Sequence, residues 1–262
     1  DKKLCGYLKN GGKVLSVFDA IFSGSGVKVI KETLDDYGQP VKGRFVARNG
    51  AADYVIPTDL IGKELYKTEY VMYAKGMETV ATDGKALVKA YEPIFNRSFR
   101  HFSSHAQAPS SHIEAYDAVV INRSKNAIYF SHPIFEIYNK KGPKWIKSML
   151  HDAIKLLLKD NLISHDGPST LFTGMNVQKD KKRYILHLLH YIPERRCTDF
   201  DLIEDVIPLY RIKINLNLPK TIKSITVVPE NKPVKFTGKG GKARFTLDEL
   251  EGHCMLCIEY ED

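Results

Sequence analysis

The pattern of apolar and polar positions divides the chain into two parts of different character. Up to residue 163, helix-like and strand-like patterns alternate along the sequence. After that point helical periodicity disappears, and short strand patterns separated by turn residues follow one another. Alternating helices and strands are typical of an α/β domain, whereas a succession of short strands is typical of an all-β domain. We therefore expect an α/β domain followed by an all-β domain.

The first residues indicate half of an α/β repeat. Leu4 and Leu8 are spaced four apart, and Gly11-Gly12 follows as a helix C-cap. Residues 14–18 form a short apolar run of the buried-strand type. A parallel sheet would need earlier strands beside this one. We therefore expect the chain to be a fragment cut inside an α/β domain.

Three further elements are predicted in the first part. Residues 118–121 and 127–130 are two apolar runs separated by a polar turn, which predicts a hairpin. Apolar positions spaced as on one helical face predict a helix that starts near Pro143 and ends at Asp160. Tyr70–Tyr73 is a candidate strand. Residues 19–64 contain many glycines and prolines and are expected to form long loops.

The second part has the pattern of a small β-sandwich. Residues 211–218 alternate strictly, with the apolar side chains on one face. Five further ranges are also predicted to be strands, namely 169–177, 183–191, 221–228, 243–247 and 254–260. Short strands at this density predict an antiparallel sandwich. With the boundary at Ser164 to Pro168, the expected domains are 1–163 and 164–262.

Composition and charge narrow the class of protein. The 262 residues are 43% hydrophobic and 27% charged, which is ordinary for a globular chain. The net charge is 39 − 31 = +8, but the lysines are spread along the chain. The densest run, residues 179–183, is expected to be a solvated hairpin turn, so we predict no nucleic-acid partner. No apolar stretch reaches the ~18 residues that cross a bilayer. The four cysteines are too scattered for a disulfide scaffold.

No catalytic residue is predicted. Ser25 lies between two glycines, but a nucleophile elbow needs glycines two positions on either side, where Ser23 and Val27 stand. Glycoside hydrolysis uses a pair of carboxylates, and no recognisable sequence frame places such a pair here. Glu204 and Asp205 are adjacent carboxylates, but no known motif surrounds them.

No metal site or cofactor is predicted either. Cys254 and Cys257 are three apart in a predicted strand, as are His187 and His190, and such residues point to opposite faces. His101 and His105 would share one face of a helix, but few carboxylates lie nearby in the sequence. We expect their loop, residues 96–109, to form hydrogen bonds across an interface instead.

Several stretches of the sequence resemble those of a known family. They resemble the C-terminal half of bacterial glycoside hydrolases with a β-galactosidase trimerisation domain, such as the family 42 β-galactosidases and related glycosidases. The most specific is Leu-His-Tyr-Ile-Pro-Glu-Arg-Arg. The stretches, with a short match at 251–253, are 96–109, 129–135, 165–169, 187–196 and 204–210.

The resemblance implies a catalytic barrel, then a flavodoxin-like domain, then a small β-sandwich. The flavodoxin-like domain is similar to class I glutamine amidotransferases without their catalytic cysteine, and its usual role is oligomer assembly. The barrel and the first part of that domain have no counterpart here. The expected function is therefore non-catalytic assembly in a parent β-galactosidase-like enzyme. The implied partners are the barrel, further copies as in a trimer, and a carbohydrate through the parent. The implied compartment is bacterial cytoplasm or periplasm.

Binding or interface candidates follow from the loop and the resemblance. They are Arg97, His101, His105, Gln107, His132, His190, Glu194, Arg195 and Arg196. Two other functions stay open. A carbohydrate-binding module would need an exposed aromatic platform, and the single Trp145 lies on a predicted helix. An amidotransferase-like enzyme would need a nucleophile at a strand-to-helix elbow.

Overall fold

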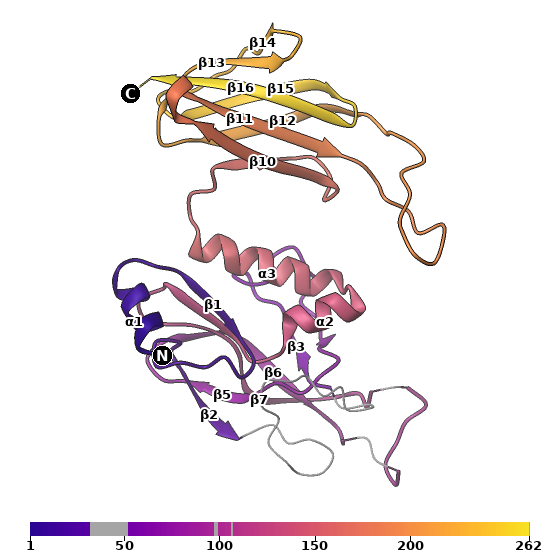
Figure 1. Ribbon diagram of the computed structural model, residues 1–262. Helices are drawn as coiled ribbons and strands as arrows, with labels where there is room; N and C mark the ends of the chain where they lie inside the picture. The colour runs from indigo at the N-terminus through magenta and orange to yellow at the C-terminus, as the bar shows by residue number, and fades with distance from the viewer. Residues whose placement is uncertain (32–51, 97–98, 106, 262) are drawn as a thin grey trace. The chain divides into compact units, whose positions relative to one another are not determined.

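The structure is a computed structural model that describes residues 1–31, 52–96, 99–105 and 107–261. The chain divides into two compact units, Asp1–Lys159 (unit 1) and Asp160–Asp262 (unit 2). In the colours of Figure 1, unit 1 runs from indigo to pink and unit 2 continues to yellow. No helix in the described ranges has the length and apolar character that crossing a membrane requires.

The described residues of unit 1 form two β-sheets. Its described strands are β1 (Val14–Val17), β2 (Val27–Lys31), β3 (Tyr54–Val55), β4 (Tyr70–Val71), β5 (Glu78–Ala81), β6 (Lys85–Pro93), β7 (Ser110–Ile121) and β8 (Ala127–Phe130). The main sheet has six strands in the order β1-β8-β7-β6-β3-β4, and β2 pairs with β5 in the other. In the main sheet β1 and β8 are parallel, and every other neighbouring pair is antiparallel.

Helices pack against the main sheet of unit 1. The described part of unit 1 has α1 (Lys2–Lys9), α2 (Ile134–Lys141) and α3 (Lys144–Leu157). The predicted apolar face of α3 is confirmed, because Ile146, Met149 and Ala153 are buried and join the core cluster. That cluster also contains Val119 and Phe130 of the predicted hairpin, which the structure confirms. Burial of this amphipathic face stabilises the helix.

The flavodoxin-like expectation is not confirmed. Parallel strands need long crossover connections, whereas β6, β7 and β8 follow one another as antiparallel neighbours. The fold is mostly β-sheet with few helices. The sequence patterns do not predict β5 or β6, and they predict only the end of β7. Register shifts at several positions between β6 and β7 break the period-2 alternation that would reveal these strands.

Unit 2 consists of two antiparallel sheets around one core. Its strands are β9 (Ile163–His165), β10 (Leu171–Gln178), β11 (Arg183–His190), β12 (Leu209–Asn217), β13 (Thr221–Val228), β14 (Lys232–Pro233), β15 (Lys242–Leu250) and β16 (His253–Glu261). The sheet orders are β10-β11-β16-β13-β14 and β15-β12-β9. One core cluster takes side chains from both sheets, including Leu186, Ile214 and Leu256.

The strand predictions for unit 2 are confirmed at nearly every position. Ile212, Ile214 and Leu216 are the buried residues of β12, as the alternation requires. The charged run at 179–183 includes an exposed turn between β10 and β11. The missed β9 is only three residues long. Because β9 pairs with β12, the division between the units falls a few residues before the expected boundary.

Candidate functional site

Unit 1 encloses a buried polar network that joins distant segments of the chain. Asp53 precedes β3, and Lys75 and Gly76 lie between β4 and β5. Tyr116 lies on β7, and His132 lies between β8 and α2. Asp53 and His132 are each 1% exposed, and Tyr116 is 5% exposed. Titratable groups so deeply buried need one another as hydrogen-bond and charge partners, because burial of an unpaired charge is costly.

Asp53 is the acceptor at the centre of this network. Its Oδ2 accepts hydrogen bonds from the Tyr116 hydroxyl at 2.5 Å and from the Gly76 N–H at 2.8 Å. The same oxygen lies 3.2 Å from His132 Nε2. Oδ1 lies 2.7 Å from Lys75 Nζ. Gly76 is required here, because a Cβ would lie 2.5 Å from the Tyr116 hydroxyl oxygen.

The network shifts the acidity of its members in opposite directions. Burial opposes ionisation of Asp53, but the hydrogen bond and charge of His132, together with Lys75, lower the pKa from 3.8 to about 2. Burial raises the pKa of Tyr116 well above its usual value, and the charge of Asp53 and the hydrogen bond to it add to this rise. Asp53 is therefore a permanent anion, and Tyr116 stays a neutral donor near neutral pH.

The network also includes a serine, which lies next to His132 as a nucleophile would. Ser131 Oγ lies 3.1 Å from His132 Nδ1, on the ring side opposite Asp53. Serine, histidine and aspartate in that order are the groups of a nucleophilic triad. Ser131 directly follows β8 and precedes α2, as an elbow nucleophile would. However, Ser131 is 0% exposed, so a substrate cannot reach its hydroxyl. The arrangement can hold unit 1 together, but it cannot attack a bound substrate.

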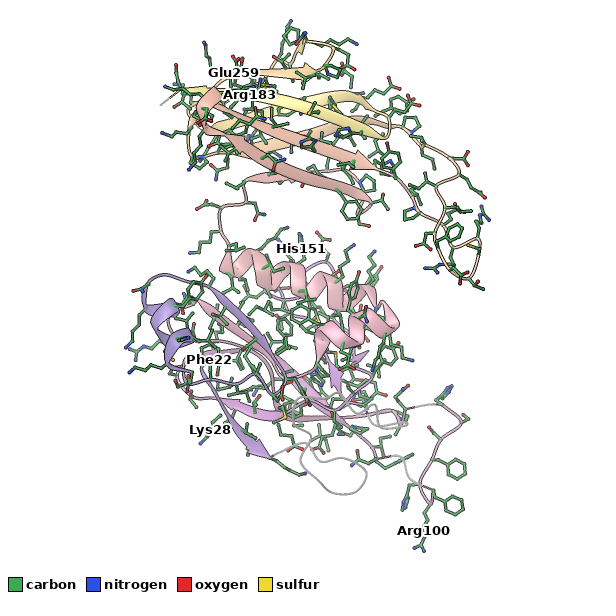
Figure 2. All side chains as sticks on the ribbon, in the orientation of Figure 1. Phe22, Lys28, Arg100, His151, Arg183 and Glu259 are labelled. Atoms are coloured by element: carbon green, nitrogen blue, oxygen red, sulfur yellow. The ribbon has the colours of Figure 1, made fainter. Side chains whose placement is uncertain are left out.

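Most of the described residues of the predicted polar loop, residues 96–109, are exposed. Arg97 lies outside the described residues. His101 and His105 are exposed, and Gln107 is half-buried. Figure 2 shows Arg100 at the far end of this loop. Among the described residues no group of three metal-ligating side chains forms.

His132 and His190 are both interior residues. His132 belongs to the buried network, and His190 is 2% exposed. His190 Nδ1 lies 3.0 Å from the carbonyl oxygen of Ile207, and its Nε2 lies 3.0 Å from the Thr170 hydroxyl. Because a carbonyl can only accept, Nδ1 carries the hydrogen. His190 thereby fixes the point where the segment after β11 returns to β12. His187, on the other face of β11, instead meets His253 at 3.1 Å.

The structure brings Glu194, Arg195 and Arg196 together in that segment, residues 191–208, which we call the arm. Backbone hydrogen bonds of 2.8 and 2.9 Å join Glu194 to Leu202. Arg195 pairs with Asp201 at 2.5 Å, and Arg196 pairs with Glu194 at 2.6 Å and with Glu204 at 2.9 Å. Exposed apolar side chains lie among these charges, at Phe200, Leu202, Ile203, Val206 and Ile207.

The arm is thus an ordered surface feature. Each exposed ion pair contributes only about 0–1 kcal/mol, but the bridge and the His190 anchor restrict the segment as well. Apolar side chains rimmed by charges are typical of an interaction surface. The remaining candidates, in the loop and in the network, belong to unit 1, whereas the arm belongs to unit 2.

Three titratable members of the network, Asp53, Lys75 and Tyr116, are not among the residues that the sequence predicts. Asp53 falls in a stretch expected to be loop, and Lys75 in a connection without a pattern. Tyr116 lies 63 residues from Asp53 along the chain. No local spacing connects such distant positions.

Comparisons with known proteins bear on the whole chain. No protein-family model matches it, and no curated protein matches it. Among solved structures it is similar to alpha-L-fucosidase isoenzyme 2 from Paenibacillus thiaminolyticus, at 30% identity and a TM-score of 0.86. That match covers 100% of this chain and 38% of the fucosidase. A beta-galactosidase from Rahnella sp. R3 matches at 12% identity and a TM-score of 0.48, over 99% of this chain and 30% of that chain.

The fucosidase match supports the relation to glycoside hydrolases that the sequence stretches imply. It does not support family 42 specifically, nor the trimerisation and amidotransferase-like parts of that resemblance. This chain spans only 38% of the fucosidase. The chain is therefore related to glycoside hydrolases, and it spans just over a third of the fucosidase's length.

Proposed function

We propose that this chain is a non-catalytic assembly region of a larger glycoside hydrolase. The observation that carries the proposal is the match of the whole chain to 38% of an alpha-L-fucosidase. The parent would hydrolyse O-glycosidic bonds with residues that lie outside this chain. The 30% identity to a fucosidase favours an α-L-fucoside as its substrate over the β-galactoside that the sequence resemblance implies.

The described residues support a non-catalytic role. A glycosidase needs a carboxylic acid whose pKa is raised, so that it can protonate the leaving group. Asp53 is the opposite case, because its pKa is lowered to about 2 and its carboxylate is 1% exposed. The serine, histidine and aspartate of the network are closed to substrate in the same way.

The partners in assembly would be the catalytic barrel of the parent and further copies of the chain. The arm supports this part of the proposal, because it presents apolar side chains on a segment anchored by His190. The loop that contains His101, His105 and Gln107 would be a second contact surface.

The test is an activity assay on the 262-residue chain alone. We expect no hydrolysis of nitrophenyl α-L-fucoside or nitrophenyl β-D-galactoside above that of buffer, because the proposal places the hydrolysing residues outside this chain. The matched control is the Ser131→Ala variant, which removes the buried hydroxyl beside His132. Turnover by the chain that scales with its concentration would contradict the proposal, and turnover lost in Ser131→Ala would assign it to the network.

A further inference from the structure

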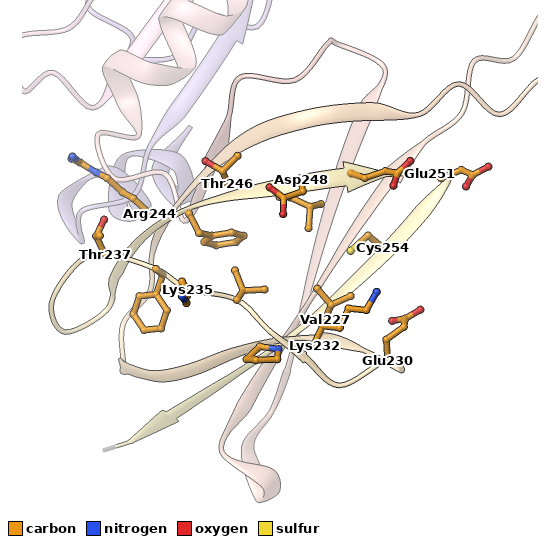
Figure 3. Close-up of a pocket in the computed structure, with 16 residues that line it drawn as sticks. Val227, Glu230, Lys232, Lys235, Thr237, Arg244, Thr246, Asp248, Glu251 and Cys254 are labelled. Atoms are coloured by element: carbon orange, nitrogen blue, oxygen red, sulfur yellow. The ribbon is translucent and has the colours of Figure 1, made fainter.

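Unit 2 has an open groove on one side of its core. The groove has a volume of about 1100 Å³ and lies between β15 and the segment that runs from the end of β13 through β14 (Figure 3). Such a volume is at the upper end of the range of ligand sites. Core side chains reach its wall, which is lined by the apolar residues Val227, Val234, Phe236, Phe245, Leu247 and Cys254.

The groove is closed at one end by the chain that crosses between the two sheets. Val234 N–H donates to the carbonyl oxygen of Ile225 at 2.8 Å, which ties this chain to β13. Three residues later, Thr237 exchanges backbone hydrogen bonds of 2.9 and 2.8 Å with Arg244 of β15. Past Arg244 no backbone hydrogen bond between described residues joins β15 to the segment that lines the other wall, so the groove stays open there.

The open part of the groove runs beside an unpaired strand edge. In an antiparallel strand the backbone groups of alternate residues point to the same side. The groups of Arg244 point away from β12 and bond to Thr237, so those of Thr246 and Asp248 point the same way. No backbone partner meets Thr246 or Asp248 on this side among the described residues. Such an edge can pair with an added strand.

Charges are unevenly distributed along the groove. In Figure 3, Arg244 lies at one end, beside Thr237, while Glu230 and Glu251 lie at the other, with Lys232 beside Glu230. Asp248 and Glu249 bring the carboxylates of the lining to four, against the three cations Lys232, Lys235 and Arg244. The chain as a whole has a net charge of +8, so this acidic end differs from its average surface. It favours a cationic residue in whatever occupies the groove.

A second copy of the same edge is a poor occupant. Antiparallel pairing of β15 with itself, centred on Thr246, would place Asp248 of one copy against Arg244 of the other. The backbone groups of Arg244 are already used by Thr237. Pairing centred on Asp248 would place two carboxylates opposite each other, and such like-charge pairs are destabilising. The edge therefore favours a different strand.

We propose that this groove binds a short extended segment of another polypeptide, which adds as a strand antiparallel to β15. Its apolar residues, at alternate positions, would cover the exposed core. A lysine or arginine near its start would lie beside Asp248 and Glu251. Pairing would stop before Arg244, whose backbone groups bond to Thr237, and an acidic residue at the end of the segment would face the Arg244 side chain there. Main-chain hydrogen bonds to Thr246 and Asp248 would supply affinity, as in other cases of strand addition. This binding is independent of the proposed role in assembly.

The probe is a capped, fluorescent peptide of sequence Lys-Val-Thr-Val-Thr-Val-Glu, titrated into the full chain and followed by anisotropy. We expect saturable binding below about 1 mM. Two peptides serve as controls, one N-methylated at the positions that face β15 and one with Lys and Glu exchanged. Each should bind at least about tenfold more weakly, because the first loses its main-chain donors and the second meets like charges.

Variants of the chain test the same contacts from the other side. Thr246→Pro removes the outward N–H, which an edge strand tolerates, and should weaken binding about tenfold. Its matched control, Thr246→Val, keeps the backbone and should bind as the original chain does. Asp248→Lys should favour the peptide with exchanged charges, and it remains informative if the proline variant does not fold.

Three results would overturn the proposal. One is no saturable binding up to about 1 mM. Another is equal affinity for the parent peptide and its N-methylated form, since strand addition depends on main-chain bonds. The last is displacement of the peptide by a neutral oligosaccharide at lower concentration, which would make the groove a carbohydrate site.

Discussion

Replacing Asp53 by asparagine should lower the stability of unit 1 by about 3 kcal/mol, because removal of one partner of a buried ion pair leaves the others uncompensated. The amide that replaces the carboxylate has a single acceptor oxygen. With that oxygen in the place of Oδ2, where it accepts from the Tyr116 hydroxyl and the Gly76 N–H, the amide NH2 would face the Lys75 ammonium, donor against donor. The measurement is urea unfolding followed by fluorescence of Trp145. This single tryptophan packs against Tyr70 and Tyr73 in unit 1, so its signal reports that unit.

The pH dependence of stability should change in the same variant. The folded pKa of Asp53 lies below its unfolded value, about 2 against 3.8. The stabilising contribution is therefore complete above about pH 4 and is lost as the pH falls toward about 2. It amounts to about 2 kcal/mol, at roughly 1.36 kcal/mol per pKa unit.

The matched control for Asp53 is Asp59→Asn. Asp59 is an exposed carboxylate, 92% accessible, paired with Lys67 at 3.4 Å. Loss of such a surface pair should change stability by at most about 1 kcal/mol. If Asp53→Asn proved as mild as Asp59→Asn, or left the acid limb of the stability curve unchanged, the network would not be the polar anchor of unit 1.

Truncation of Leu186 to alanine should destabilise unit 2 by roughly 3 kcal/mol, since it removes a fully buried side chain and leaves a cavity. Leu186 is 0% exposed at the centre of β11, opposite Leu256 of β16 and Met175 of β10. Labelling of the buried Cys257 thiol on β16 reports opening of this unit. We expect faster labelling of Cys257 while the Trp145 transition stays where it is.

Leu189→Ala provides the internal comparison for Leu186. Leu189 lies three residues along the same strand, on the opposite face, and is 38% exposed. Its truncation should have a much smaller effect, because less apolar area returns to water. An equal loss of stability of unit 2 in both variants would contradict the account. So would a shift of the Trp145 unfolding transition in Leu186→Ala, because the core is divided into two units.

The elements that sequence patterns predict are those with a strong local period. The face of α3 and the alternation of β12 each repeat over several turns or residues, and both are confirmed. The hairpin of β7 and β8 has its polar turn between two apolar runs and is also confirmed. In each case residues close together in the sequence form the buried face, so their spacing predicts the element without knowledge of the fold.

The sheet order of unit 1 could not be predicted in the same way. β1 is an apolar run of four residues, and the helix before it suggests a parallel α/β sheet. β1 does pair in parallel with β8, but the rest of the sheet is antiparallel. The irregular ladder of β6 and β7 hides two long strands from period-2 analysis, so the patterns favour a flavodoxin-like domain that the structure does not confirm.

The candidate site depends on contacts that sequence spacing does not encode. Asp53 and His132 are 79 residues apart, yet their side chains lie 3.2 Å apart in the fold. Among the predicted residues, Glu194, Arg195 and Arg196 are consecutive and could be recognised as one surface. The structure adds the bridge to Leu202 and the anchor at His190, which turn that string into the arm.

Light scattering on a size-exclusion column, across a dilution series, tests the assembly role most directly. We expect a mass above the 29.7 kDa of one chain, and about 89 kDa (3 × 29.7) if three copies associate. The variant with Phe200→Asp and Ile203→Asp, which places charge on the exposed apolar part of the arm, should shift the mass toward the monomer. A monodisperse species of 29.7 kDa at every concentration would contradict a role in self-assembly.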